Sequence, residues 1–154
     1  MGRKLRASLL AVAGAAAFAL GATPTAAHAG PVQGQQQDQA VRIEIEPQGE
    51  LVTAAAGCPV SAYGYSGTAM CGTIALVCSW DEAFVIAPSR TVWHAWPGSG
   101  GWREMPNNGR ADNMWDCYRN GDGQRQVEVW TAADNVYYSY YSGGWRGWYY
   151  YPGS

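Results

Sequence analysis

Four cysteines, at positions 58, 71, 78 and 117, carry the most readily assigned chemistry of this 154-residue chain. An even number of cysteines in a chain that begins with an export signal predicts disulfide bonds, whereas zinc sites favour Cys-x-x-Cys spacing with histidine partners. No Cys-x-x-Cys occurs, and His94 is the only histidine beyond residue 29. Three pairings are possible. We favour Cys58–Cys71 with Cys78–Cys117, because Cys78 and Cys117 occupy the same place ahead of two related segments. No metal and no cofactor are expected.

Catalytic groups are weakly indicated. His94 with Ser139 or Asp112 has the residue types of a hydrolase, but no Gly-x-Ser-x-Gly elbow accompanies them. Two pairs, Asp81 with Glu82 and Asp112 with Asp116, have the residue types needed for glycoside cleavage. The setting of Asp81 and Glu82 is typical of a tight turn, however, and Asp112 follows a loop. The sequence therefore predicts a protein that is not an enzyme.

Aromatic side chains offer a different chemistry. All eight Trp and all ten Tyr lie beyond residue 60. Both residue types join an apolar ring to a hydrogen-bonding tip, which suits the faces of sugars and equally suits protein interfaces. The candidate ligand-binding residues are aromatic or carry a guanidinium group, and they lie in the aromatic-rich half of the chain: Trp93, Trp96, Trp102, Arg103, Tyr138, Trp145, Arg146 and Trp148, with Trp130 as a further stacking surface.

Most of these residues fall in two stretches of nearly the same sequence. Residues 85–96 are followed by Gly-Gly-Trp at 100–102, and residues 129–140 are followed by Gly-Gly-Trp at 143–145. The offset is 44 residues before the turn and 43 after it. A period of about 43 residues with short aromatic strands is typical of β-blade repeats. The predicted organisation is a disulfide-stabilised β domain over 58–154 that contains repeats 74–107 and 113–153.

The elements that must position these residues are predicted to be strands and turns only. β-Branched and aromatic residues dominate the segments, and Gly- and Asn-rich turns separate them. The predicted strands beyond the cysteine-rich start are Ile74–Ser79, Glu82–Ala87, Val92–Trp96, Met114–Arg119, Gln126–Thr131, Val136–Tyr141 and Gly147–Tyr151.

Each repeat thus supplies about four short strands, the size of one antiparallel meander or blade. Two such sheets side by side would leave open edges that invite aggregation. Two all-β arrangements avoid this outcome. Copies of the chain associate into a closed propeller, or the two units pack face to face as a small disulfide-stapled sandwich.

The hairpin of the second repeat is aromatic on both faces. Because side chains alternate along a strand, Tyr138 and Tyr140 share one face, whereas Tyr137 and Tyr141 share the other. A sheet with one packed face needs one apolar side only. The hairpin is therefore expected to be sandwiched between layers or to present one face to a ligand or partner.

The N-terminal segment predicts export. Residues 1–29 have three basic residues near the start, an apolar, alanine-rich run over 9–22 and a small-x-small cleavage site at 27–29. The apolar run is too short to span a bilayer, so we expect a secreted, extracellular protein with no membrane association after signal cleavage. Residues 30–57 are predicted to form a polar arm with one short strand over 41–46.

The net charge of the secreted form excludes some partners. Cleavage after residue 29 removes three of the 10 Lys and Arg residues and none of the 12 acidic ones, which leaves a net charge of −5. Nucleic acids and anionic membranes both require a basic surface. Neither is expected as a partner.

Over residues 74–153, the aromatic strand followed by Gly-Gly-Trp in both copies resembles the two-repeat β-propeller lectins of bacteria and fungi. Some of those lectins bind fucose and assemble from short chains into a closed propeller. The resemblance implies a homo-oligomer and a tryptophan floor at Trp102 and Trp145. It does not extend to the charged sugar clamp, because the arginine positions of that clamp are held by Phe84 and Glu128.

Two functions follow from these observations. The first is a lectin-like module that binds a glycan or polysaccharide by aromatic stacking. The alternative is a secreted inhibitor of an extracellular enzyme, a hydrolase, which would present the aromatic loop over residues 96–102.

Overall fold

The computed structural model describes residues 39–47 and 57–152. The predicted signal peptide, residues 1–29, lies outside the described residues, as does much of the predicted polar arm. In the described ranges the chain is all-β with antiparallel sheets, as predicted, and its single helical element is the 3-10 turn η2 (Pro106–Asn108).

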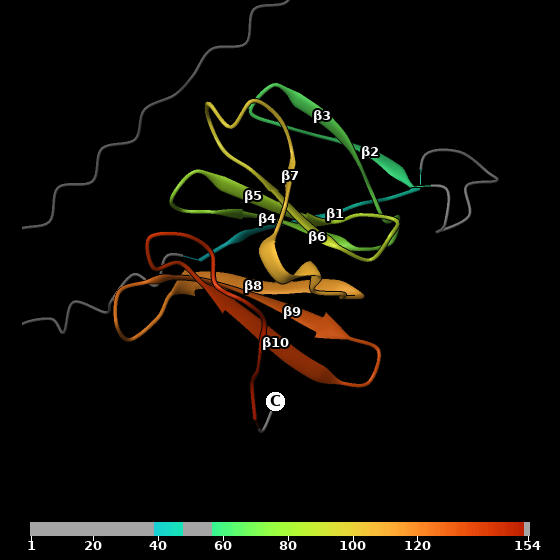
Figure 1. Ribbon diagram of the computed structural model, residues 1–154. Coiled ribbons are helices and arrows are strands. Elements are labelled where there is room, and N and C mark those ends of the chain that lie inside the picture. The colour runs from blue at the N-terminus through green and yellow to red at the C-terminus, as the bar shows by residue number, and fades with distance from the viewer. Residues whose placement is uncertain (1–38, 48–56, 153–154) are drawn as a thin grey trace, which may run out of the picture. The chain divides into compact units, whose positions relative to one another are not determined.

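Two larger sheets account for most of the strands (Figure 1). The first sheet has the order β1-β4-β5-β6-β7 and the second has the order β11-β10-β9-β8. The first sheet consists of β1 (Val41–Glu44), β4 (Ile74–Cys78), β5 (Glu82–Ile86), β6 (Val92–Ala95) and β7 (Arg103–Glu104). The second sheet consists of β8 (Asn113–Arg119), β9 (Arg125–Thr131), β10 (Asn135–Tyr140) and β11 (Tyr149–Tyr150).

Each predicted repeat forms one meander. The strands β4 to β7 follow one another in the first sheet, and β8 to β11 do so in the second. The seven strands predicted from residue 74 onward are all present, with ends that agree to within a residue or two. The common origin of the two meanders stays a prediction.

The hairpin of β2 (Cys58–Ala62) and β3 (Tyr65–Ala69) was not among the predicted strands. Its two-residue turn places Tyr63 at φ 53° and Gly64 at φ 83°. Positive φ at both central residues matches the right-handed twist of a tight antiparallel hairpin. This stretch had too few matching positions to be counted as a further repeat.

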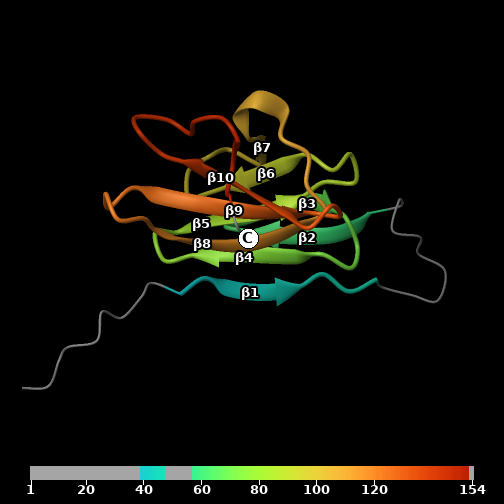
Figure 2. The ribbon, with the colours of Figure 1, turned by 90° about the horizontal axis from the view of Figure 1, so that it is seen from below.

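The two larger sheets pack face to face around one core (Figures 1 and 2). The side chains that fill this core come from both sheets and are almost fully buried. They include Leu76, Phe84, Ile86 and Val92 from the first sheet and Met114, Val127 and Val129 from the second. A disulfide between Cys78 of β4 and Cys117 of β8 links the layers. The fold is therefore the small disulfide-stapled sandwich, whereas a propeller built from several copies stays a prediction.

The other face of the first sheet is covered by the β2–β3 hairpin. Val85 and the half-buried Trp93 point to that side and pack with Cys58 and Ala69 of the hairpin. The second disulfide, Cys58–Cys71, closes this layer. These two bonds form the cysteine pairing that we favoured from the sequence.

The short strand expected near residue 41 forms β1 at the edge of the first sheet, paired with β4. Alternation along residues 41–46 places Val41, Ile43 and Ile45 on one face. Only Ile45 is buried, in the layer under the hairpin, whereas Val41 and Ile43 are 59% and 49% exposed. β1 extends the sheet beyond the area that the hairpin covers.

The second sheet is packed on one side only. Val127 and Val129 point into the core, so Gln126, Glu128 and Trp130 point to the opposite side of β9. Among the described residues, no further strand or helix lies over that side (Figure 1). This open face is the largest difference between the two sheets.

The Cys78–Cys117 bond should contribute more to stability than the Cys58–Cys71 bond. Its loop spans 39 residues against 13, and a longer closed loop restricts the unfolded chain more. We expect replacement of Cys78 and Cys117 together by Ala to lower the free energy of unfolding by roughly 4 kcal/mol, and replacement of Cys58 and Cys71 by roughly 3 kcal/mol. Urea unfolding followed by tryptophan fluorescence measures both. A smaller loss for the 78–117 pair would contradict the assignment of this bond as the main link between the layers.

Candidate functional site

The open face of the second sheet gathers aromatic and polar side chains from all four of its strands. The cross-strand register defines this set, since directly paired residues point to the same side. The open face is formed by Trp115, Asp116 and Tyr118 of β8, Gln126, Glu128 and Trp130 of β9, Val136, Tyr138 and Tyr140 of β10, and Tyr149 and Tyr151 at β11.

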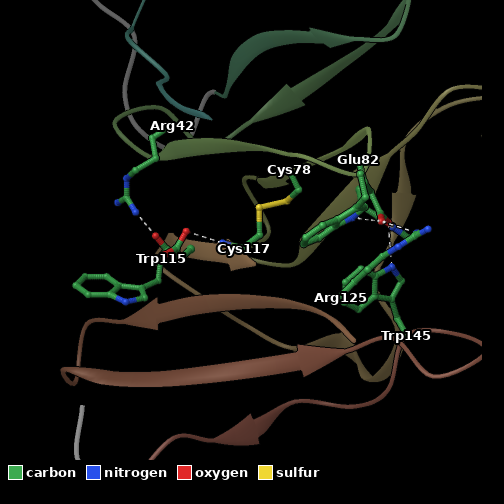
Figure 3. Close-up of a disulfide and its surroundings, with 10 residues drawn as sticks. Arg42, Cys78, Glu82, Trp115, Cys117, Arg125 and Trp145 are labelled. Carbon is green, nitrogen blue, oxygen red and sulfur yellow. Dashed lines mark hydrogen bonds and ion pairs between the residues drawn. A yellow bond between two sulfur atoms is a disulfide. The ribbon is translucent and has the colours of Figure 1, made fainter. Parts of the chain in front are cut away.

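A bulge in β8 adds Trp115 to this face. Met114 pairs with Val129 and Asp116 pairs with Glu128, so Trp115 is the extra residue between them. Such a bulge re-aims one side chain while the flanking residues keep their register. The carbonyl of Trp115 accepts a hydrogen bond from the Arg42 guanidinium of β1 (Figure 3). The Trp115 residue remains 48% exposed, so its ring is available to a ligand.

The centre of the open face is hollowed into a cleft of about 400 Å³. Small-molecule sites have volumes of roughly 300–1,000 Å³ and combine apolar walls with a few polar groups. This aromatic cleft is lined by Trp115, Tyr118, Glu128, Trp130, Asp134, Val136 and Tyr151. Rings form most of its walls, and two carboxylates provide its charge.

Glu128 lies in the aromatic cleft and is held by neighbouring side chains. The residue is only 6% exposed. Its Oε1 accepts hydrogen bonds from the Tyr118 hydroxyl at 2.5 Å and from Gln126 Nε2 at 2.9 Å. Gln126 Nε2 also lies 2.7 Å from the Tyr118 oxygen, and Asn120 of the β8–β9 turn donates to Gln126 Oε1 at 3.4 Å. The network fixes the carboxylate before any ligand arrives.

The same network keeps the Tyr118 phenol protonated. Burial raises its pKa most, and the hydrogen bond to Glu128 and the charge of that carboxylate raise it further. Tyr118 is therefore a fixed hydrogen-bond donor beside a fixed acceptor.

Tyrosines extend the open face beyond the cleft. The Tyr138 ring lies 5.5 Å from Tyr149 and 5.8 Å from Tyr151, and Tyr140 lies 5.7 Å from Tyr149, measured between ring centroids. On the opposite side of β10, Tyr137 packs against the core. The hairpin that is aromatic on both faces thus has one face in the sandwich and the other open.

Of the eight ligand-binding residues predicted from the sequence, Tyr138 belongs to the open face. Two others, Trp93 and Trp102, pack under the β2–β3 hairpin. Trp93 Nε1 donates to Thr91 Oγ1, and Trp102 Nε1 donates to the carbonyl of Tyr65. A Cβ atom on Gly67 would lie 2.7 Å from the Trp102 ring. The close contact shows that this indole holds the hairpin to the sheet.

The predicted pair Trp96 and Arg103 lies at the β6–β7 turn. The Arg103 guanidinium carbon is 5.6 Å from the Trp96 ring centroid, and the guanidinium donates to the Ser99 carbonyl. The Trp96 ring also lies 4.9 Å from the His94 ring, measured between centroids. These contacts stabilise the turn.

Arg146 and Trp148 lie in the segment between β10 and β11. Arg146 donates to the Ser142 carbonyl. Trp148 packs so closely on Gly109 that a Cβ atom there would lie 2.2 Å from the ring. Neither residue lines the aromatic cleft, so the structure does not bring the predicted binding residues together.

Trp145 completes a buried polar cluster around Glu82 (Figure 3). Trp145 Nε1 and His94 Nδ1 lie 2.9 Å and 2.6 Å from Glu82 Oε1. Trp80 Nε1 donates to Glu82 Oε2 at 2.9 Å, and Arg125 Nη1 lies 3.7 Å from the same oxygen. Glu82 is on β5 and Trp145 follows β10, so the cluster ties the two sheets together.

The hydrolase grouping suggested by residue type is not assembled. His94 contacts Glu82, whereas Ser139 donates to the Arg146 carbonyl and Asp112 pairs with Arg90. Asp81 occupies a tight turn, as expected, with its N–H bonded to the Cys78 carbonyl.

Sequence reasoning missed Trp115, Tyr118 and Tyr151 as a group, and it noted Glu128 only as a mismatch to a lectin clamp. One signal was present: Gln126, Glu128 and Trp130 alternate with two valines along one strand. Such alternation indicates a polar and aromatic face opposite an apolar one. The bulge at Trp115 carries no comparable signal.

No family model, curated protein or solved structure matches this chain. Within the described residues, no helix has the length and apolar character needed to cross a membrane. The same part of the chain contains no group of three or more His, Cys, Asp or Glu side chains arranged to hold a metal ion.

Trp145 and Trp115 should differ in how much they contribute to the free energy of unfolding. Trp145→Phe removes the indole N–H that bonds to buried Glu82, so we expect the free energy of unfolding to fall by about 1–3 kcal/mol. Trp115→Phe, on the exposed side of the bulge, should change it by less than about 0.5 kcal/mol. Urea denaturation measures both, and equal losses would contradict this division.

Tyr118 should make stability depend on alkaline pH. The folded state holds the phenolic proton more tightly than the unfolded chain, whose tyrosines titrate near the ordinary value of 10.0. The contribution of Tyr118 is therefore complete below pH 10.0 and is lost as the pH rises further. Unfolding free energies measured across this range should fall more steeply for the natural chain than for Tyr118→Phe. Parallel curves would show that the phenol is not protected.

Proposed function

We propose that this protein is a secreted carbohydrate-binding protein, and that its glycan lies on the open face of the second sheet, over the aromatic cleft. The single observation that carries the proposal is the position of Glu128 among Trp115, Trp130 and Tyr118. Rings surround a buried, pre-oriented acceptor on a face that no other described element covers.

The chemistry of the cleft suits a sugar. Pyranose rings have apolar C–H faces, which stack on indole and phenol rings, and hydroxyl rims, which need donors and acceptors. Trp115 and Trp130 offer the ring faces, and Glu128 with Tyr118 offers an acceptor beside a donor. A purely apolar ligand would leave the buried carboxylate without compensation, at a cost in binding free energy.

The length of the open face favours more than one sugar unit. Tyr138, Tyr140 and Tyr149 continue the aromatic surface beyond the cleft walls. Neighbouring strands lie about 4.8 Å apart, so successive rings can contact successive units of a chain. A polysaccharide or oligosaccharide is the ligand class that fits.

Export accords with the chemistry of the chain. Two disulfides in a small domain require an oxidising compartment to form and persist. Together with the predicted signal peptide, they support an extracellular site of action.

The alternative function, an inhibitor of an extracellular hydrolase, depended on the aromatic loop over residues 96–102. Both indoles of that loop make contacts within the chain: Trp96 contacts His94 and Arg103, and Trp102 packs on the β2–β3 hairpin. The tip consists of small or exposed residues such as Pro97 and Gly98. The loop therefore offers no aromatic anchor, and the glycan is the better proposal.

Glycan-array binding of the full chain, followed by tryptophan-fluorescence titration with the best oligosaccharide, tests the proposal. We expect Trp115→Ala and Trp130→Ala each to weaken binding by at least about tenfold, because each removes one stacking surface. Thermal unfolding of each variant establishes that it is folded.

Trp96→Ala is the matched control, since it removes a half-buried indole from the β6–β7 turn, which is outside the second sheet. It should leave the affinity unchanged. Loss of binding in Trp96→Ala with full binding in Trp115→Ala and Trp130→Ala would place the site at the β6–β7 turn and overturn the assignment. An array with no binding to any glycan would overturn the function itself.

A further inference from the structure

The two buried glutamates of this protein differ in their charged partners. Glu82 and Glu128 are 4% and 6% exposed. Glu82 lies beside Arg125, whose guanidinium can balance its charge, and His94 Nδ1 lies 2.6 Å from its Oε1. Glu128 receives hydrogen bonds from Tyr118 and Gln126, which are neutral. Among the described residues, no Arg or His side chain forms an ion pair with Glu128.

Among the residues that the structure describes, the lining of the aromatic cleft includes a second carboxylate and no cationic side chain. Asp134, in the β9–β10 turn, lines the cleft with Glu128. The two arginines of β8 and β9 lie outside this lining and contact other groups. The Arg119 guanidinium lies over the Trp80 ring and donates to the Gly123 carbonyl, and that of Arg125 lies over the Tyr141 ring.

These features together define the charge that the cleft accepts. A carboxylate removed from water is costly unless an opposite charge compensates it, and the attraction between two charges grows as the surroundings become less polar. The faces of Trp and Tyr rings carry negative electrostatic potential and attract cations. Rings and carboxylates therefore act in the same direction: they favour a positive group and repel a negative one.

Resting on the proposed carbohydrate function, we propose that the aromatic cleft selects an amino sugar, in which a protonated amine lies among Trp115, Trp130 and Tyr118 and pairs with Glu128 and Asp134. The sugar supplies the counter-charge that Glu128 lacks within the protein. Uronic acids and other acidic sugars are excluded by the same charges. N-Acetylated sugars, in which the amine is capped and neutral, bind more weakly than the free amine.

The test compares two oligosaccharides of one backbone and one length, a glucosamine oligomer and its fully N-acetylated form, with a galacturonic acid oligomer as the acidic probe. Tryptophan fluorescence of the full chain is titrated with each, in a buffer slightly below neutral pH where the sugar amine is protonated. We expect the glucosamine oligomer to bind at least about tenfold more tightly than the acetylated form, and the acidic oligomer not to bind. Added salt should reduce this preference, since it screens the charge attraction.

Two variants connect the preference to the cleft. Glu128→Gln and Asp134→Asn should each weaken glucosamine binding several-fold and leave binding of the acetylated form nearly unchanged. Asp134 is exposed and has a φ of 56°, which Asn adopts readily, so Asp134→Asn tests the charge even where Glu128→Gln disturbs folding. Asp122→Asn, on the exposed β8–β9 turn, removes the same charge away from the cleft and should have no effect.

The outcomes separate this inference from the proposed function. Equal affinity for the free and acetylated oligomers, with loss of both in Trp115→Ala, would overturn the amine preference and support the carbohydrate site. Binding of tetramethylammonium to the natural chain, with no binding of any oligosaccharide, would overturn both. A preference for the amine that survives in Glu128→Gln and Asp134→Asn would overturn the assignment of its source to these two carboxylates.

Discussion

Face-to-face packing of two sheets around one shared core is the interaction on which the rest of this structure depends. The core side chains of β4, β5 and β6 meet those of β8 and β9, and the Cys78–Cys117 bond holds the layers in place. A sheet has two faces, and this contact uses one face of each. The first sheet covers its second face with the β2–β3 hairpin, whereas the second sheet has no such cover among the described residues. The layer that lacks a cover is the one whose outer side combines aromatic rings with a buried carboxylate.

The aromatic residues divide into two groups according to this packing. Trp102 contacts the β2–β3 hairpin, Trp145 contacts the Glu82 cluster and Trp148 contacts Gly109. Each of these indoles joins parts of the chain that are distant in sequence. Their indole rings stabilise the layers. Trp115 and Trp130 instead border a cleft, where their rings have a free side. Residue type is the same in both groups, and only the position relative to the core separates a packing role from a binding role.

The two buried glutamates are divided in the same way, one between the layers and one on the open face. Between the layers, Glu82 has cationic and indole partners that satisfy both of its oxygens. On the open face, Glu128 is satisfied by neutral donors alone, and its charge lacks an ionic partner among the described residues. A fully satisfied polar network fixes the geometry of its side chains. A buried charge without an ionic partner favours a ligand of opposite charge. The first glutamate therefore contributes to the architecture, and the second is the source of the selectivity that we propose for the cleft.

The sequence alone predicts the strands from residue 74 onward, the all-β class and, as the favoured one of three pairings, the two disulfides, because these depend on local alternation, turn residues and the equivalence of two related segments. It did not reveal the β2–β3 hairpin, whose strands are short and weakly patterned, or the bulge that turns Trp115 outward. It indicated that the β10 hairpin is aromatic on both faces, but an alternating pattern is unchanged when its two faces are exchanged. Which face meets the core, and with it which aromatic rings and which glutamate remain available, depends on how the two sheets pack together. Burial is a property of the contacts between distant segments, which residue spacing along one strand does not contain.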